Sequence, residues 1–172
     1  NNYSVLPVYI IDESMPVGSS SRWWLKKSLG SLCKSMSGNL VIKKGDPKTI
    51  LKQLIDSYDI TNMCWNARYS KQELLQDNEI KEYVIKHGLT LNIYHSTLLR
   101  DPSKTLKKDS TPFKVYTPFY KQKYSEFKYE SHDYDIHKLH YLPTKENKDS
   151  KSVIEAAVPE ENWHDKLDSV WE

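Results

Sequence analysis

The stretch ITNMCWNARYSKQELLQD, residues 60–77, decides the fold class of this chain. It begins as a short apolar run that ends at Trp65 and Asn66, continues through a turn with Arg68 and Tyr69, and becomes a helical segment. In open α/β sheets, ligands bind where strands end and helices begin, because a helix N-terminus offers unpaired backbone N–H groups and a positive dipole. We therefore expect the functional site at this strand-to-helix junction.

The same alternation of strand and helix continues on both sides of this stretch. Apolar runs that predict strands lie at residues 5–11, 40–42, 60–65 and 89–94, and helices are predicted near residues 22–36, from Pro47 onward, and at 71–87. Parallel strands joined by helices of this length form a sheet that is covered on both faces. The sequence therefore predicts an α/β fold with a parallel sheet.

The first predicted helix carries apolar side chains at helical spacing. Ser20 or Ser21 is its expected N-cap, and Gly38 is expected to end it. One ring of the adjacent pair Trp23 and Trp24 should face the sheet, with the other near the strand ends. The stripe that we expect to lie on the sheet consists of Trp24, Leu25, Ser28, Leu29, Leu32 and Met36.

Length and composition set the domain organisation. A chain of 172 residues accommodates one domain and a tail. The sequence from Lys121 onward is polar, so we assign residues 1–120 to the α/β domain and residues 121–172 to a linker with short ordered pieces. The net charge of +2 is too small to indicate nucleic-acid binding, and the lysines between Lys104 and Lys123 are interpreted as a solvated surface. No apolar run is long enough to span a membrane, and the two distant cysteines fit a reducing, cytoplasmic setting.

Sequence motifs for the common chemistries are lacking: there is no phosphate-binding loop, no dinucleotide fingerprint and no zinc-protease or hydrolase motif. His132, His137 and His140 are interpreted as ordinary tail residues, so no metal site is predicted. Cys64 is interpreted as a small buried side chain in a strand. Gln72 and Glu73, in the first turn of the helix after the decisive junction, have two open interpretations: they bind a planar heterocycle, or Glu73 complements the helix dipole.

Four segments together resemble a known family. They are GSSSRWWLKKSL (18–29), GDPKTIL (45–51), CWNARYSKQELLQD (64–77) and PFKVYTPFYK (112–121). In order and spacing they resemble the N-terminal domain of DNA photolyases and cryptochromes, and PFKVYTPF is the most specific of them. The resemblance covers residues 5–121, and a weaker one at WHDKLDSVWE (163–172) looks like the linker that leads into the family's flavin domain.

The resemblance implies a Rossmann-like antenna domain that precedes a larger helical domain with FAD. In the family, the excited reduced flavin splits pyrimidine dimers in DNA, and a second chromophore, methenyltetrahydrofolate or a deazaflavin, harvests light. An Asn–Glu pair that contacts the folate in some members corresponds to Gln72 and Glu73. We expect no catalytic residues in this chain, contact with damaged DNA only through the flavin domain, and no membrane association.

The resemblance also implies that the family's first, central strand is missing. The strands at 5–11 and 40–42 would then pair on one side of an unfilled slot, and those at 60–65 and 89–94 on the other. Because the chain starts at Asn1 and has no flavin domain, we expect a fragment that does not repair DNA by itself. A cryptochrome-type photoreceptor domain and a degenerate, stand-alone nucleotide- or folate-binding module remain as alternatives.

Overall fold

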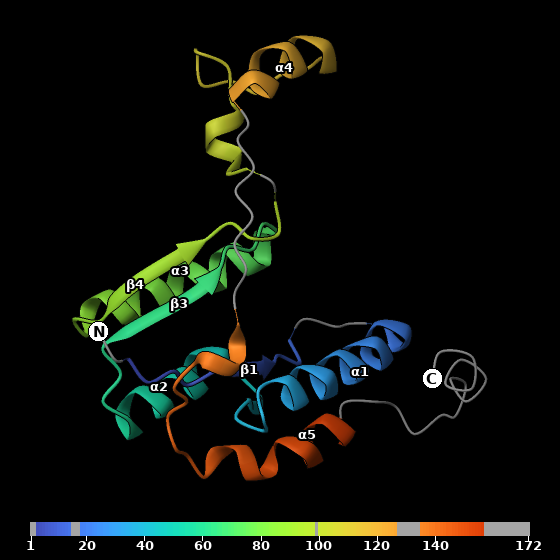
Figure 1. Cartoon of the computed structure of the whole chain (residues 1–172). Coiled ribbons are helices and arrows are strands. Elements are labelled where there is room, and N and C mark those ends of the chain that lie inside the picture. The colour runs from blue at the N-terminus through green and yellow to red at the C-terminus, as the bar shows by residue number, and fades with distance from the viewer. Residues whose placement is uncertain (1–2, 15–17, 99, 127–134, 157–172) are drawn as a thin grey trace. The chain divides into compact units, whose positions relative to one another are not determined.

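The structure is a computed structural model that describes residues 3–14, 18–98, 100–126 and 135–156 (Figure 1). The chain forms two compact units, one of Asn1–Leu54 with Tyr134–Glu172 and the other of Ile55–Asp133. Strands and helices alternate along the chain, and the strands of each described sheet run parallel. The α/β class predicted from the sequence is therefore confirmed.

The first unit is built around β1 (Val8–Ile11) and β2 (Val41–Lys44), with Val8 opposite Val41. Val41 and Ile42 both have 0% exposure although successive strand side chains point to opposite faces, so β2 is covered on both sides. The helices of this unit are α1 (Ser19–Ser35), α2 (Pro47–Ser57) and α5 (Ser150–Ala156), with the short 3-10 turns η3 (Ile136–Lys138) and η4 (Glu146–Asp149). Pro47 occupies the first position of α2, as predicted.

The face that α1 turns to the core differs in part from the predicted stripe. Leu29 belongs to a buried cluster with Leu40, Ile42 and Ile154, and it is joined from α1 by Leu25, Cys33 and Met36. Trp24 and Leu32 are 56% and 38% exposed, and Ser28 is also exposed, so their predicted place on the sheet is wrong. Of the two adjacent tryptophans, Trp23 is buried and Trp24 is exposed.

The ends of α1 show one correction and one confirmation. The N-cap is Gly18, which has no side chain to offer, whereas Ser20 and Ser21 lie inside the first turn. Gly38, with φ at +79°, terminates the helix as predicted, and its N–H donates to the Cys33 carbonyl at 2.8 Å. A positive φ at this position favours glycine because it has no Cβ to clash.

The polar C-terminal segment contributes to the core of the first unit. Ser150 of α5 is buried; its hydroxyl accepts a hydrogen bond from the Ile42 N–H and donates one to the Leu40 carbonyl, each at 3.0 Å. These backbone groups lie on the edge of β2 opposite β1, because the Val41 N–H bonds the Pro7 carbonyl of the β1 side. Ser150 therefore takes the place of a neighbouring strand at this edge. The division at residue 120 stays a prediction.

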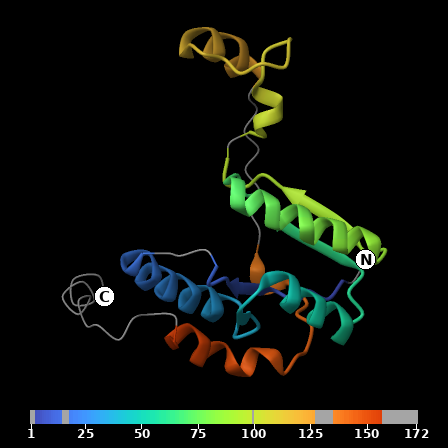
Figure 2. The same cartoon turned by 180° about the vertical axis from the view of Figure 1, so that it is seen from behind.

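The second unit contains β3 (Asn62–Asn66), β4 (Thr90–Tyr94) and α3 (Lys71–Lys86), which packs on the strand pair as Figure 2 shows. Ile80 and Val84 of α3 are buried. Along β3, half-buried Met63 and Trp65 alternate with exposed residues, so the strand has one covered and one open face. Cys64 lies on the open face; its predicted burial is wrong because an apolar run was read as buried on both sides.

Residues 100–126 form η1 (Pro102–Thr105), α4 (Tyr116–Lys123) and η2 (Tyr124–Glu126). The helix tolerates Pro118 because this residue falls in the first turn, where backbone N–H groups have no intrahelical partner.

The strand pairing matches the predicted arrangement. β1 pairs with β2 and β3 pairs with β4, and within the described residues neither sheet has a third strand. Thr61 and Ala67 bond to the β4 side, so the backbone groups of Asn62, Cys64 and Asn66 face the opposite edge. The β3–β4 pair therefore presents, along β3, an edge with backbone donors and acceptors that a further strand could use.

Candidate functional site

The predicted site lies at the carboxyl ends of β3 and β4. The strands run in register from Asn62 opposite Thr90 to Asn66 opposite Tyr94. The Ala67 N–H donates to the Tyr94 carbonyl at 2.7 Å, which extends the pairing by one residue. The loops that follow both strands therefore start at the same edge, where parallel sheets bind ligands.

The loop after β3 leads into α3 through a capping box. The Glu73 N–H donates to the Ser70 hydroxyl at 3.3 Å, and the Ser70 N–H donates to the Glu73 carboxylate at 3.2 Å. The hydrogen bond with the Ser70 side chain lowers the pKa of Glu73, so the carboxylate is ionised near neutral pH. This contact supports the structural interpretation of Glu73, because the side chain closes the first turn of its own helix.

Gln72 and Glu73 are adjacent in this first turn, the position predicted for them. Gln72 is exposed and Glu73 is half-buried. A carboxylate has lone pairs for several hydrogen bonds, so one bond to the Ser70 backbone leaves acceptor capacity for a ligand N–H group. The Gln72 amide can both donate and accept. These groups can form hydrogen bonds with a planar heterocycle that carries N–H and carbonyl groups.

Arg68 joins the loop to the body of α3. Its Nε donates to both oxygens of Asp77 at 3.1 and 3.3 Å, and its Nη2 donates to the Gln76 oxygen at 2.7 Å and also pairs with Asp77. Asp77 is only 13% exposed, and a guanidinium that binds a carboxylate with two nitrogens is oriented as well as attracted. The contact fixes the loop on which Tyr69 and Ser70 lie.

Tyr69 connects this loop to the loop after β4. Its hydroxyl and Nδ1 of His95 share a hydrogen bond at 2.8 Å, and Nε2 of His95 lies 3.7 Å from an Asp101 oxygen. Hydrogen bonds from the Ser103 hydroxyl and N–H lower the pKa of Asp101. A Tyr–His–Asp chain thus bridges the ends of the two strands.

Sequence reasoning missed Arg68–Asp77 and Tyr69–His95–Asp101 as interacting sets. A signal was present: Arg68 and Tyr69 follow one strand, His95 follows the next, and the ends of neighbouring parallel strands meet at one edge. The interpretation requires knowing that these two strands are neighbours, which pattern alone does not give.

The described residues contain neither a metal-binding cluster nor a membrane-spanning helix. No three His, Cys, Asp or Glu side chains there converge to hold a metal ion. His137 and His140 are described, whereas His132 lies outside the described residues. None of the described helices combines the length and apolarity that a bilayer crossing requires.

Comparison with known proteins assigns the chain to a family. The family model described as DNA photolyase matches residues 1–142. The chain belongs to the DNA photolyase family. Its α/β units correspond to the N-terminal domain of that family, as the four sequence segments indicated.

Individual relatives agree with this membership. A deoxyribodipyrimidine photo-lyase of Agrobacterium fabrum is 36% identical over 121 residues, which are 68% of this chain and 25% of that protein. Cryptochrome-2 of Arabidopsis thaliana is 27% identical over 69% of this chain and 21% of its own length. The crystal structure of a bacterial class III photolyase from Agrobacterium tumefaciens superposes with a TM-score of 0.76 at 28% identity, covering 98% of this chain and 36% of that one. The chain thus spans about a quarter of the curated relatives' length.

Proposed function

We propose that this chain is the light-harvesting α/β portion of a deoxyribodipyrimidine photolyase whose intact form repairs pyrimidine dimers in DNA with a light-excited flavin. The observation that carries the proposal is the 36% identity to a deoxyribodipyrimidine photo-lyase, against 27% to a cryptochrome over a similar length. By itself the chain has no repair activity in this proposal.

Gln72 and Glu73 would hold the antenna chromophore, methenyltetrahydrofolate or a deazaflavin. Support comes from their hydrogen-bonding groups. The ionised carboxylate of Glu73 accepts, the exposed amide of Gln72 donates and accepts, and both lie at a helix N-terminus beside the strand ends. When bound, the chromophore absorbs near-ultraviolet or blue light and passes its energy on. The chain's part is to bind the ring and orient it.

The partner in this proposal is a flavin-binding helical domain of the same protein, which carries FAD and contacts the damaged DNA. The protein is proposed to work in the cytoplasm. The free cysteines Cys33 and Cys64 support a reducing compartment, because oxidising compartments favour disulfides.

Titration of the chain with methenyltetrahydrofolate tests the antenna assignment. Fluorescence of the folate should reveal saturable binding, and Glu73→Gln should weaken it by about tenfold, since one charge-assisted hydrogen bond is worth about 1.4 kcal/mol more than its neutral counterpart. Gln can still close the capping box, so the helix start is preserved. Glu82→Gln, on an exposed site of the same helix, is the matched control. Equal affinities of all three proteins would refute the assignment of Glu73.

The cryptochrome alternative is kept because a plant cryptochrome matches over 69% of the chain. The two functions differ in one assay. The protein encoded by the full reading frame should convert thymine dimers to thymines under blue light if it is a photolyase. Flavin photoreduction without dimer repair would favour a photoreceptor, and a chain that binds neither folate nor deazaflavin would favour a degenerate module.

A further inference from the structure

Five aromatic side chains form one continuous row on residues 113–124. Phe113 and Phe119 meet edge to face at 5.7 Å between ring centroids, and Tyr116 lies 6.4 Å from Phe119. Tyr116, Tyr120 and Tyr124 then follow along α4 at intervals of four residues, with centroids 5.7 and 4.7 Å apart. Spacing of four residues puts these three rings on one side of the helix.

This aromatic row is open to solvent. Tyr116 is 70% exposed, Tyr124 is 64%, Tyr120 is 42% and the neighbouring Val115 is 62%. No residue of α4 is buried. An isolated helix of eight residues is not stable in water without an apolar contact to hold it. We expect α4 to gain that contact from a surface outside the described residues.

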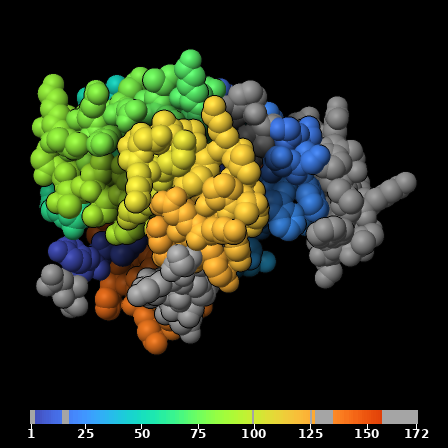
Figure 3. Space-filling view, turned by 90° about the horizontal axis from the view of Figure 1, so that it is seen from above, coloured from blue at the N-terminus to red at the C-terminus, as the bar shows by residue number. Residues whose placement is uncertain are grey.

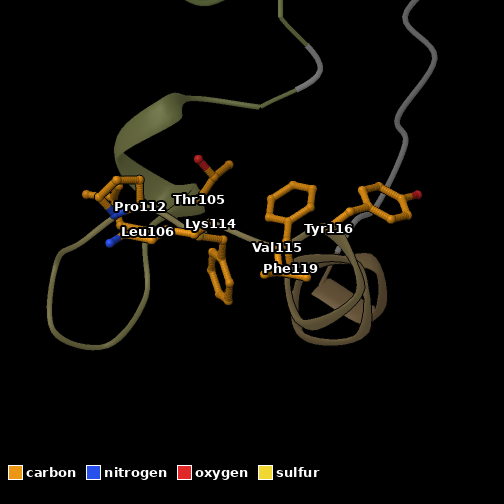
Figure 4. A pocket seen from close by; sticks show the side chains of 8 residues that line it. Thr105, Leu106, Pro112, Lys114, Val115, Tyr116 and Phe119 are labelled. Carbon is orange, nitrogen blue, oxygen red and sulfur yellow. The ribbon is translucent and has the colours of Figure 1, made fainter.

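A cavity of about 280 Å³ opens beside the row. Thr105 and Leu106 border it on one side, and Val115 and Phe119 of the α4 segment border it on the other, as Figure 4 shows. Protein interfaces often combine exposed aromatic side chains with an adjacent pocket, because an anchor side chain of the partner can fill the pocket. The surface of residues 100–126 is drawn in yellow and orange in Figure 3.

The charge around the row is predominantly positive. Residues 100–126 contain seven Lys and Arg and three Asp and Glu, a net charge of +4 against +2 for the whole chain. Lys114 and Lys121 flank the tyrosines and are exposed. A complementary partner would therefore present an apolar groove with an acidic rim.

We infer that the aromatic row of residues 113–124 is the docking surface for the remaining domain of the protein. The inference rests on the proposed function, which supplies that domain. The length of the matched class III photolyase supports this occupant. The superposition covers 98% of this chain but only 36% of that structure, so most of the relative has no counterpart in the 172 residues. The surface is an aromatic ridge, the kind of feature that buries the most area per side chain.

Single-stranded nucleic acid, which also binds aromatic and basic surfaces, fits this surface less well. Base stacking needs free ring faces. Tyr120 and Tyr124 stack on each other with only 26° between their planes, so each ring covers a face of its neighbour. The exposed aliphatic Val115 beside the rings also suits a protein groove rather than a stacked base.

Tyrosine nitration tests this docking. The 172-residue chain and the product of its full reading frame are treated briefly with tetranitromethane, and nitration of Tyr116, Tyr120 and Tyr124 is quantified by mass spectrometry. Docking should slow nitration of these three tyrosines by about tenfold in the longer protein. If the domains are docked about nine-tenths of the time, the tyrosines are accessible to the reagent only about a tenth of the time. The references are Tyr3 and Tyr94, which are 61% and 57% exposed and lie outside the row.

A variant in the longer protein gives a second readout. Tyr116→Ser with Tyr120→Ser should release the surface and raise nitration of Tyr124 to the rate in the short chain, whereas Tyr94→Ser should leave Tyr124 protected. Equal nitration of the row in both wild-type proteins would overturn the inference, and so would a reading frame that encodes no further domain. Protection that appears only after adding oligothymidylate would overturn it in favour of nucleic acid.

The outcomes separate this inference from the proposed function. Dimer repair by the longer protein with an unprotected row would refute only the docking surface. A protected row in a protein that repairs no dimers would support the docking surface and refute the photolyase assignment.

Discussion

Ser150 is the residue that most directly joins the polar C-terminal segment to the sheet. Its hydroxyl accepts a hydrogen bond from the Ile42 N–H and donates one to the Leu40 carbonyl at the edge of β2, and Ser150 is 2% exposed. Ser150→Ala would leave both backbone groups buried without a partner. We expect the free energy of unfolding to fall by about 2 kcal/mol, within the cost of an unsatisfied buried group. Urea denaturation followed by circular dichroism measures the change.

Ser152 provides the control on the same helix. Its hydroxyl donates to the Asp149 carbonyl at 2.8 Å, but the residue is exposed, so water can replace the bond. Ser152→Ala should change the stability by less than about 0.5 kcal/mol. Equal losses in the two variants would show that the bridge to β2 contributes nothing beyond helix propensity.

Single residues also show how far the candidate site could be predicted. Gln72 and Glu73 were expected in the first turn of the helix after β3 and lie there, whereas their role as chromophore ligands stays a prediction. The Tyr69–His95 contact could not be placed, because it joins residues 26 apart through the pairing of β3 with β4. Local patterns specify local geometry, whereas long-range contacts need the sheet order.

At the scale of elements, the capping box predicts how the stability of α3 depends on pH. Ser70→Ala removes the bond to the Glu73 N–H and should cost about 1 kcal/mol near neutral pH. The pKa of Glu73 is lowered in the folded chain, so its contribution is present above the ordinary Glu pKa and is lost as the pH falls through the lowered value. The deficit of Ser70→Ala relative to the natural chain should therefore shrink on acidification.

Urea titrations of both proteins at neutral pH and at pH values below the ordinary Glu pKa check this dependence. Ser96→Ala, an exposed serine in the loop after β4, is the control and should be neutral at each pH. A deficit that grows on acidification would mean that the capping box does not set the protonation of Glu73.

The elements themselves were predictable to different degrees. β3, α3 and β4 were placed within a few residues, because apolar runs with β-branched residues and long helical segments are the clearest sequence signals. The face of α1 was partly wrong, because apolar residues nearly surround the helix and Trp24 competes with Leu25 for the stripe. α5 was missed as a core element because Val153 and Ile154, which pack in the core, form only a short apolar pair in a polar stretch.

At the scale of the whole molecule, each of the two strand pairs relies on helices for its buried residues. A two-stranded sheet is marginal by itself and depends on the helices that pack on it. In the first unit α1 and α5 contribute to one buried cluster, and in the second α3 provides Ile80 and Val84. Each unit therefore has buried apolar residues of its own.

Separate centres predict separate responses to core truncation. Ile154→Ala in α5 and Ile80→Ala in α3 each remove a buried side chain of 8% and 5% exposure. Each should cost about 3 kcal/mol, a loss that speeds amide exchange by roughly a hundredfold where exchange occurs through unfolding of that unit. Hydrogen exchange with mass spectrometry should show the effect of Ile154→Ala in peptides of β1, β2 and α1, and that of Ile80→Ala in peptides of β3, β4 and α3. Each variant is the control for the other, and a loss of protection in both units from either truncation would mean that the chain unfolds as one cooperative body.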